Sequence, residues 1–200
     1  MKLNHANRIT ILRILLIVPF VIFMLKDDHP TMGTFMRYAA LLIFLVMAFS
    51  DAYDGYIARK RKEVTPLGAF LDPTADKLLM ACACVLLSVN NTAVPGFRLP
   101  PTVAVLIIAK DMFLLIGFVI LRLLNFQAKP TPALIGRIAT ALQLTMVAAI
   151  LIAPEISEVL TGWIWFLRFL WWAAAGTAIV TTLIYIKVGT KYIEQFENGR

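Results

Sequence analysis

Four aspartates stand out in an otherwise apolar chain: Asp51, Asp54, Asp72 and Asp76. The first two are three positions apart and the last two are four apart, so each pair shares one face of a helix. Each aspartate costs about 2.5–3.5 kcal/mol near the centre of a bilayer, and four carboxylates also repel one another. The group therefore needs a cation to compensate it, and clustered carboxylate oxygens suit Mg²⁺ or Mn²⁺.

Two glycines flank the carboxylates, because Gly55 follows the first pair and Gly68 precedes the second. In a helix each glycine costs about 1 kcal/mol relative to alanine, so a reason for it is expected. Two reasons remain open: close approach of neighbouring helices, or access of a flat base or a phosphate to the backbone. Cys82 and Cys84 are spaced for neither a disulfide nor a zinc site, and we interpret them as helix-packing residues.

The segments that carry these residues have the composition of membrane helices. Of the 200 residues, 60% are hydrophobic and 16% are charged, which leaves too little polar surface for a water-soluble domain. The mean hydropathy is +0.80. At roughly 20 apolar residues per span, the chain accommodates about six spans. We predict an all-α integral membrane protein with six transmembrane helices, in one domain over residues 1–200. The predicted spans are approximately 9–25, 35–59, 66–89, 102–124, 133–153 and 163–188.

Basic residues predict the orientation of these spans. The segment 59–62 after the second span is entirely basic, and most other lysines and arginines fall in segments on the same side. The positive-inside rule places these segments and both termini in the cytoplasm. The net charge of +7 fits this topology and anionic headgroups, and the basic recognition patch that nucleic acid requires is missing. We expect a multi-pass protein of a bacterial inner membrane.

The short loop between the second and third predicted spans makes them an antiparallel hairpin. Both aspartate pairs then lie at the same depth, toward the cytoplasmic side, and face each other. The sequence therefore predicts a cage of four carboxylates between these two helices.

The run that contains the aspartates resembles the signature of the CDP-alcohol phosphotransferases, D-x-x-D-G-x-x-A-R-x8-G-x-x-x-D-x-x-x-D, with every position filled. Eight fixed positions recur by chance on the order of once in 10^10 starts, so the pattern carries little false-positive risk. Its members are Asp51, Asp54, Gly55, Ala58, Arg59, Gly68, Asp72 and Asp76. Two further stretches resemble the family, one near the N-terminus and one in the fifth span: Asn7, Thr10, Arg13 and Pro19, then Gly136, Arg137, Thr140 and Gln143.

The resemblance implies an enzyme that moves a phosphatidyl group from CDP-diacylglycerol to an alcohol and releases CMP. It also implies that the four aspartates bind two divalent ions, Mg²⁺ or Mn²⁺, and that Asp76 takes the proton of the acceptor hydroxyl. The residues that would line the CMP site are Thr10, Gly55, Ala58, Arg59 and Gly68. A homodimer is expected from the resemblance alone.

The acceptor alcohol is open between glycerol 3-phosphate and phosphatidylglycerol. Lys110, Asp111 and the stretch 129–132 resemble the eukaryotic-type cardiolipin synthases of the family, which use phosphatidylglycerol. The chain length is typical of phosphatidylglycerophosphate synthases, the commonest bacterial branch, and on that basis we favour glycerol 3-phosphate. The candidate acceptor residues are Lys110, Asp111, Arg122 and Arg137.

Each of these candidates also has a structural interpretation. Lys110 and Asp111 could pair with each other, because ionised groups inside a membrane usually find partners. Arg137 could simply mark the cytoplasmic face, and Arg13 could either snorkel to the interface or reach into the interior. A cation transporter is the alternative of another class, but it would hold its carboxylates at the midplane within an inverted repeat, and no repeat is visible.

Overall fold

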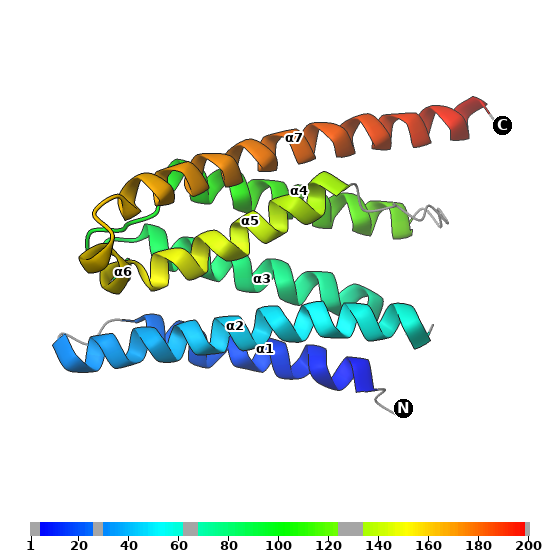
Figure 1. Ribbon diagram of the computed structural model, residues 1–200. Coiled ribbons are helices and arrows are strands. Elements are labelled where there is room, and N and C mark those ends of the chain that lie inside the picture. The colour runs from blue at the N-terminus through cyan, green and yellow to red at the C-terminus, as the bar shows by residue number, and fades with distance from the viewer. Residues whose placement is uncertain (1–4, 26–29, 62–67, 124–133, 199–200) are drawn as a thin grey trace.

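The computed structural model describes residues 5–25, 30–61, 68–123 and 134–198, whose secondary structure is entirely α-helical (Figure 1). The helices are α1 (His5–Met24), α2 (Pro30–Arg61), α3 (Gly68–Ser88), α4 (Pro101–Leu123), α5 (Leu134–Leu151), α6 (Ala153–Val159) and α7 (Trp163–Asn198). In lipid a helix satisfies every backbone N–H and C=O within its own segment, which explains this architecture for so apolar a chain. The predicted all-α class is confirmed.

The six longer helices run alternately in opposite directions along one bundle (Figure 1). We call proximal the end at which α1, α3 and α5 begin and α2, α4 and α7 end, and distal the opposite end. The first helix thus begins at the same end at which the last one finishes, as an even number of spans requires. That the proximal end faces the cytoplasm stays a prediction.

Three helices are long and apolar enough to cross a membrane, within the part of the chain that the structure describes. They cover Met32–Ser50, Leu134–Leu151 and Trp163–Thr190, and α1 adds the shorter apolar segment Ile11–Met24. With 21 and 23 residues, α3 and α4 are also long enough, but they carry charged side chains in their middle. The helices therefore indicate a membrane protein, while the count of six spans stays a prediction.

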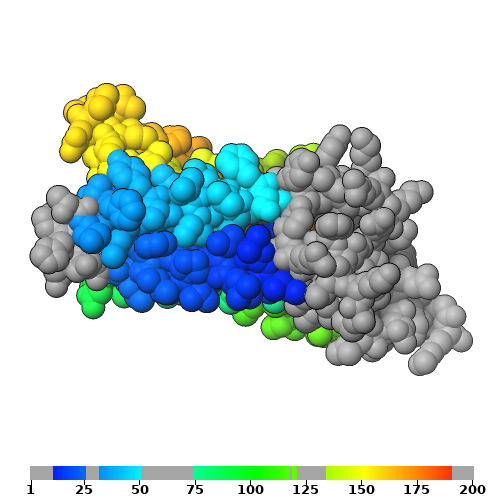
Figure 2. Space-filling view, turned by 90° about the horizontal axis from the view of Figure 1, so that it is seen from below, coloured from blue at the N-terminus to red at the C-terminus, as the bar shows by residue number. Residues whose placement is uncertain are grey.

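Large apolar side chains on the outside of the bundle support the same conclusion. In α1, Leu12, Leu15 and Val18 are 56–61% exposed, and in α2 Leu42 and Phe49 are 64% and 71% exposed. Figure 2 shows α1 and α2 side by side on one face of the molecule. A water-soluble monomer rarely exposes so much apolar surface, whereas the acyl chains of lipids would cover it.

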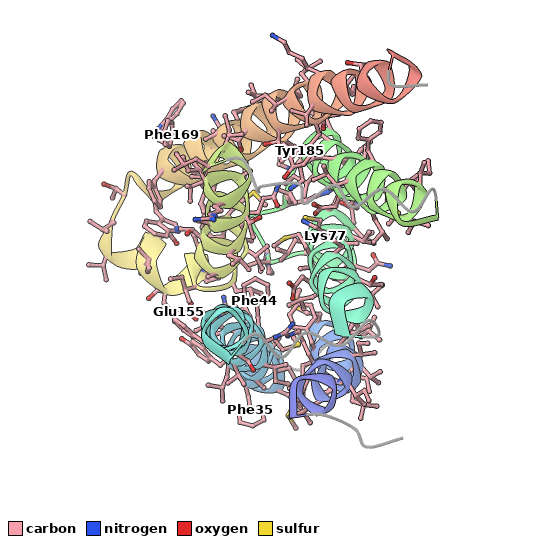
Figure 3. All side chains as sticks on the ribbon, turned by 90° about the vertical axis from the view of Figure 1, so that its right-hand side faces the viewer. Phe35, Phe44, Lys77, Glu155, Phe169 and Tyr185 are labelled. Carbon is pink, nitrogen blue, oxygen red and sulfur yellow. The ribbon has the colours of Figure 1, made fainter. Side chains whose placement is uncertain are left out.

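The interior is one cluster of buried apolar side chains to which every helix contributes. Helix α1 packs against both α2 and α3, α3 packs against α4, and α7 packs against α4 and α5 (Figure 3). The rings of Phe20 in α1 and Phe44 in α2 are 6.1 Å apart, and both side chains are buried. The predicted antiparallel course of α2 and α3 is seen, and among the described residues both α1 and α5 pack against each of these two helices.

Prolines mark the start of three helices, where their missing N–H is not needed. Helix α2 begins at Pro30 and α4 at Pro101, while Pro154 occupies the first turn of α6. The sequence predicts a single span over 133–153 and misses α6, because seven residues are too short for a visible periodicity. Pro154 cannot donate the hydrogen bond that would continue α5, so a new helix begins there. Helix α7 also extends to Asn198, ten residues beyond the predicted end at Val188.

At the distal end an ionic contact joins α6 to α2. The guanidinium of Arg37 in α2 donates to the carboxylate of Glu155 in α6, and the hydroxyl of Tyr38 also bonds this carboxylate. Arg37 further stacks over the ring of Tyr38, at 5.5 Å from its centroid. The contact holds the short helix against the distal end of α2, and Figure 3 shows Glu155 beside that helix.

Candidate active site

The backbone brings all four aspartates to the proximal half of the bundle. Asp51 and Asp54 belong to the last turns of α2, and Asp72 and Asp76 belong to the first turns of α3. Because α2 ends and α3 begins at the proximal end, both pairs lie toward the same end (Figure 1). The part of the prediction that concerns their placement along the bundle therefore agrees with the helices.

The cage itself stays a prediction. The side chains of Asp51, Asp54 and Asp72 lie outside the described set, within which no group of three or more metal-binding side chains occurs. The same holds for the side chains of the predicted CMP-site residues, whose helices alone are described. These residues are Thr10 in α1, Gly55, Ala58 and Arg59 in α2, and Gly68 at the start of α3.

Asp76 is the one predicted metal ligand whose side chain is described. Its Oδ1 accepts a hydrogen bond from Nη1 of Arg13 at 3.1 Å, and this ion pair joins α3 to α1. The side chain of Arg13 is only 3% exposed, so it turns into the bundle instead of snorkelling to the interface. The carboxylate of Asp76 is 35% exposed, so neighbouring side chains leave part of it accessible. A partly exposed carboxylate supplies the kind of oxygen ligand that a hard divalent cation prefers.

A second group of charged side chains lies next to this pair. Nζ of Lys77 in α3 and Nζ of Lys110 in α4 both contact Oδ1 of Asp111, at 2.6 and 2.9 Å. Lys110 also donates to Oε1 of Gln143 in α5 at 3.1 Å. The predicted pairing of Lys110 with Asp111 is confirmed, and both side chains are almost fully buried. Figure 3 shows Lys77 on the side of α3 toward α4.

These side chains form one layer across the bundle, which we call the polar layer. It consists of Arg13, Asp76, Lys77, Lys110, Asp111 and Gln143. At about 1.5 Å per residue, its members lie about 12–20 Å from the proximal ends of their helices. Ionised groups at that depth need partners, and each carboxylate of the layer has a basic partner on another helix.

Among the described residues the polar layer contains three basic side chains, Arg13, Lys77 and Lys110, and two carboxylates, Asp76 and Asp111. In addition, Nε2 of Gln143 is buried and has no hydrogen-bond partner among the described residues. An unmatched buried donor favours an oxygen acceptor nearby. The layer therefore offers one free donor, the amide of Gln143, to an oxygen acceptor such as a phosphate.

The remaining predicted acceptor residues lie closer to the proximal end. Arg137 is exposed in the first turn of α5, and the side chain of Arg122, near the end of α4, lies outside the described set. Next to Arg137, a Cβ at Gly136 would meet, among the described residues, only the hydroxyl oxygen of Tyr185, at an ordinary 3.8 Å. Packing against the described residues therefore does not require a glycine at position 136.

The sequence alone predicted no site role for three members of the polar layer: Lys77, Gln143 and Arg13. For Arg13 it also left open whether the side chain points to the interface or into the interior. Their partners are 33 to 63 positions away along the chain, so spacing alone does not reveal them. A signal was nevertheless present, because an ionisable side chain inside an apolar helix is by itself a sign of a functional or paired site.

The fold and the polar layer define a class: a helical membrane protein with a charged site between its helices. The family model of CDP-alcohol phosphatidyltransferases matches residues 3–184, and the chain belongs to this family. The predicted resemblance is confirmed.

Curated relatives share one part of the chain. One relative is a CDP-diacylglycerol--glycerol-3-phosphate 3-phosphatidyltransferase of Pseudomonas fluorescens. The two chains are 48% identical over 85 residues, a stretch that covers 42% of this chain and 41% of the relative. Another relative is the protein of the same name from Escherichia coli K12. It is 44% identical to this chain over 88 residues, a stretch that covers 44% of this chain and 46% of the relative. The matched stretch thus spans less than half the length of either relative.

Proposed function

We propose that the protein transfers a phosphatidyl group from CDP-diacylglycerol to glycerol 3-phosphate and releases CMP. The acceptor hydroxyl oxygen forms a bond to the phosphorus that carries the diacylglycerol. The bond between this phosphorus and the CMP oxygen breaks, and CMP leaves with the electron pair. The observation that carries the proposal is the complete family motif on the proximal ends of α2 and α3, where all four aspartates lie toward one end of the bundle.

The aspartates have the donor chemistry for divalent ions. Asp51, Asp54, Asp72 and Asp76 would hold two Mg²⁺ or Mn²⁺ ions, which neutralise the pyrophosphate and stabilise the attacking and leaving oxygens. The residues assigned to the CMP part of the donor are Thr10, Gly55, Ala58, Arg59 and Gly68, of which Arg59 can pair with a phosphate.

Asp76 is the proposed general base that takes the proton of the acceptor hydroxyl. It is 35% exposed, as a base must be in order to reach a substrate, and Arg13 holds one of its oxygens at 3.1 Å. Arg13 thereby orients the carboxylate from α1. Phosphoryl transfer depends on positioning and on stabilisation of charge, so an oriented base beside bound cations is sufficient for the chemistry.

Glycerol 3-phosphate is the acceptor that the comparisons favour, since both relatives carry it in their names. The two lysines of the polar layer and the unmatched amide of Gln143 suit an acceptor that bears a phosphate. Of the four candidate acceptor residues, Lys110, Arg122 and Arg137 are proposed to bind the acceptor, whereas Asp111 is bound to Lys77 and Lys110. Phosphatidylglycerol, the acceptor of a cardiolipin synthase, is the alternative, because it too carries an anionic phosphate.

We further propose six spans in a bacterial inner membrane, both termini and the active site on the cytoplasmic side, and a homodimer.

An acceptor assay tests the proposal. The protein is purified in mild detergent, supplied with CDP-diacylglycerol and Mg²⁺, and CMP release is followed with one acceptor at a time. Glycerol 3-phosphate is expected to support release, and phosphatidylglycerol is not. Release with phosphatidylglycerol alone would replace the proposed acceptor, and no release with either one would refute the proposal.

Variants link the activity to the carboxylates. Asp72→Asn and Asp76→Asn each remove one charge without changing the side-chain size, and each is expected to lower turnover by at least about 100-fold. Glu158→Gln is the matched control, because Glu158 is exposed in α6 at the distal end. Normal turnover of Asp76→Asn would overturn its assignment as the base.

A further inference from the structure

Two adjacent residues of α3 carry opposite charges and bind different neighbours. Asp76 accepts a hydrogen bond from Arg13 of α1 at 3.1 Å, and Lys77 donates one to Asp111 of α4 at 2.6 Å. Successive side chains on a helix point about 100° apart, so the two contacts pull on α3 in different directions. A rotation of α3 about its axis therefore disturbs both of them.

The carboxylate of Asp111 is itself held in place. Its side chain is 4% exposed, and Oδ1 also contacts Nζ of Lys110 at 2.9 Å. Lys110 is in turn bonded to Gln143 of α5 at 3.1 Å. The contacts thus run without interruption from α5 through α4 to Lys77, the residue next to Asp76.

We propose that Asp111 is a positioning residue: through Lys77 it sets the rotation of α3, and thereby the direction in which Asp76 points. This inference rests on the proposed function, in which Asp76 is the base. Asp111 acts through Lys77 and does not take part in the chemistry.

A small rotation is enough to matter. Side chains reach about 5 Å from the helix axis, so a rotation of about 20° moves the carboxylate of Asp76 by about 1.7 Å. A displacement of about 1 Å at a reacting group can lower the rate by about 100-fold. The loss falls on kcat, because Lys77 and Asp111 orient the base instead of binding the donor.

Positioning explains the ion pair better than stability does. Well-packed apolar side chains of similar volume often stabilise a buried site as well as an ion pair. An apolar contact has little directional preference, whereas a hydrogen-bonded ion pair at 2.6 Å specifies both a distance and an orientation. The ion pair therefore specifies the rotation of α3 about its axis, whereas apolar contacts already specify the position of α3 along the bundle.

Kinetics of four variants test the proposal in the detergent-purified protein with glycerol 3-phosphate as acceptor. Lys77→Met and Asp111→Asn are each expected to lower kcat by about 100-fold, while KM for CDP-diacylglycerol changes by less than about threefold. Because the two residues act through one contact, the double variant is expected to lose about 100-fold as well, not about 10,000-fold. Lys77→Arg keeps the cation and is expected to recover most of kcat. Lys187→Met removes an exposed lysine of α7 and serves as the control.

A readout independent of activity comes from the two cysteines of the chain, both on α3. Cys84 is fully buried and lies about two helical turns beyond Lys77, on the same face of the helix. In a Cys82→Ser background, the rate at which a maleimide labels Cys84 reports the rotation of α3. Lys77→Met is expected to raise this rate severalfold at unchanged total folded protein, and Lys77→Arg is not.

The outcomes separate this inference from the proposed function. If the wild-type protein releases no CMP, the proposed function fails. If the wild type is active and Lys77→Met keeps its kcat, or if the loss appears in KM, the positioning role is wrong. Unchanged labelling of Cys84 together with a reduced kcat would also overturn it, because the effect would then not pass through the rotation of α3.

Discussion

The burial of Lys110 makes a double-mutant cycle with Asp111 the sharpest test of the polar layer as a structural unit. The variant Asp111→Leu removes the carboxylate that lies 2.9 Å from Nζ of Lys110, whose side chain is 2% exposed. Removing one partner of a buried ion pair costs about 3–5 kcal/mol, because the other charge is left without compensation. Lys77 is 23% exposed and can turn its ammonium group toward water, so its own loss adds little.

The double variant Lys110→Met/Asp111→Leu removes both charges. The remaining destabilisation comes from Gln143, whose amide oxygen loses the hydrogen bond that Lys110 donates. An unsatisfied buried amide oxygen costs about 1–3 kcal/mol. The double variant is therefore expected to be more stable than Asp111→Leu alone by about 2 kcal/mol, even though it carries one more substitution.

Unfolding of purified protein by denaturing detergent, followed by circular dichroism, measures the free energies of the wild type, both single variants and the double variant. The cycle yields the coupling between Lys110 and Asp111 directly. The reasoning is refuted if Asp111→Leu unfolds at the wild-type midpoint, or if the double variant is destabilised by the sum of the two single losses. Either result would mean that the carboxylate of Asp111 does not stabilise the buried ammonium of Lys110 in the folded protein.

Three further predictions concern the rest of the bundle. Phe20→Ala empties a fully buried site in α1 and is expected to lower the free energy of unfolding by about 3–5 kcal/mol, measured by the same titration. Arg98→Ala removes the donor to the carbonyl oxygen of residue 88 at 2.7 Å and is expected to cost about 1–3 kcal/mol at the distal end of α3. Partial burial raises the pKa of Glu155, but a backbone hydrogen bond, the hydroxyl of Tyr38 and the guanidinium of Arg37 together lower it below its ordinary value. A lowered folded-state pKa means that Glu155 stabilises the fold above its ordinary pKa, and that this contribution disappears as the pH falls through the lowered value. The acid-induced loss of stability is therefore expected to be smaller in Glu155→Gln, as thermal unfolding at a series of pH values would show.

Matched controls are available for these variants. Leu15 of α1 is 61% exposed, so Leu15→Ala is expected to change stability far less than Phe20→Ala in the same titration. Glu158→Gln removes an exposed carboxylate from the same short helix as Glu155 and is expected to leave the acid limb unchanged. A Phe20→Ala variant as stable as Leu15→Ala would contradict the assignment of the core.

Much of the site could be read from local spacing. The intervals within the pairs Asp51/Asp54 and Asp72/Asp76 predict shared helix faces, and the order of the spans predicts that both pairs lie toward one end. The apolar composition predicts helices, because only helices satisfy a backbone within lipid in a chain of this kind. These inferences depend on neighbours along the chain, which is why one sequence suffices for them.

The ends of the helices are harder to predict from local spacing. Helix α6 depends on Pro154, which ends one helical hydrogen-bond pattern and begins another within seven residues. So short an element leaves no period to detect, and its contact with Arg37 of α2 joins residues 118 positions apart.

What the amino-acid sequence determines here is the chemistry that is available: carboxylates at helical spacing, apolar helices to hold them, and a motif that defines the family. What only the tertiary structure decides is which charges meet. Arg13 reaches Asp76 across 63 positions and Lys77 reaches Asp111 across 34, on helices brought together by apolar packing. The physical reason is that an ion pair inside a membrane is specified by which helices are neighbours and by their rotation. Both properties arise from the packing of the whole bundle, not from the residues beside the charge.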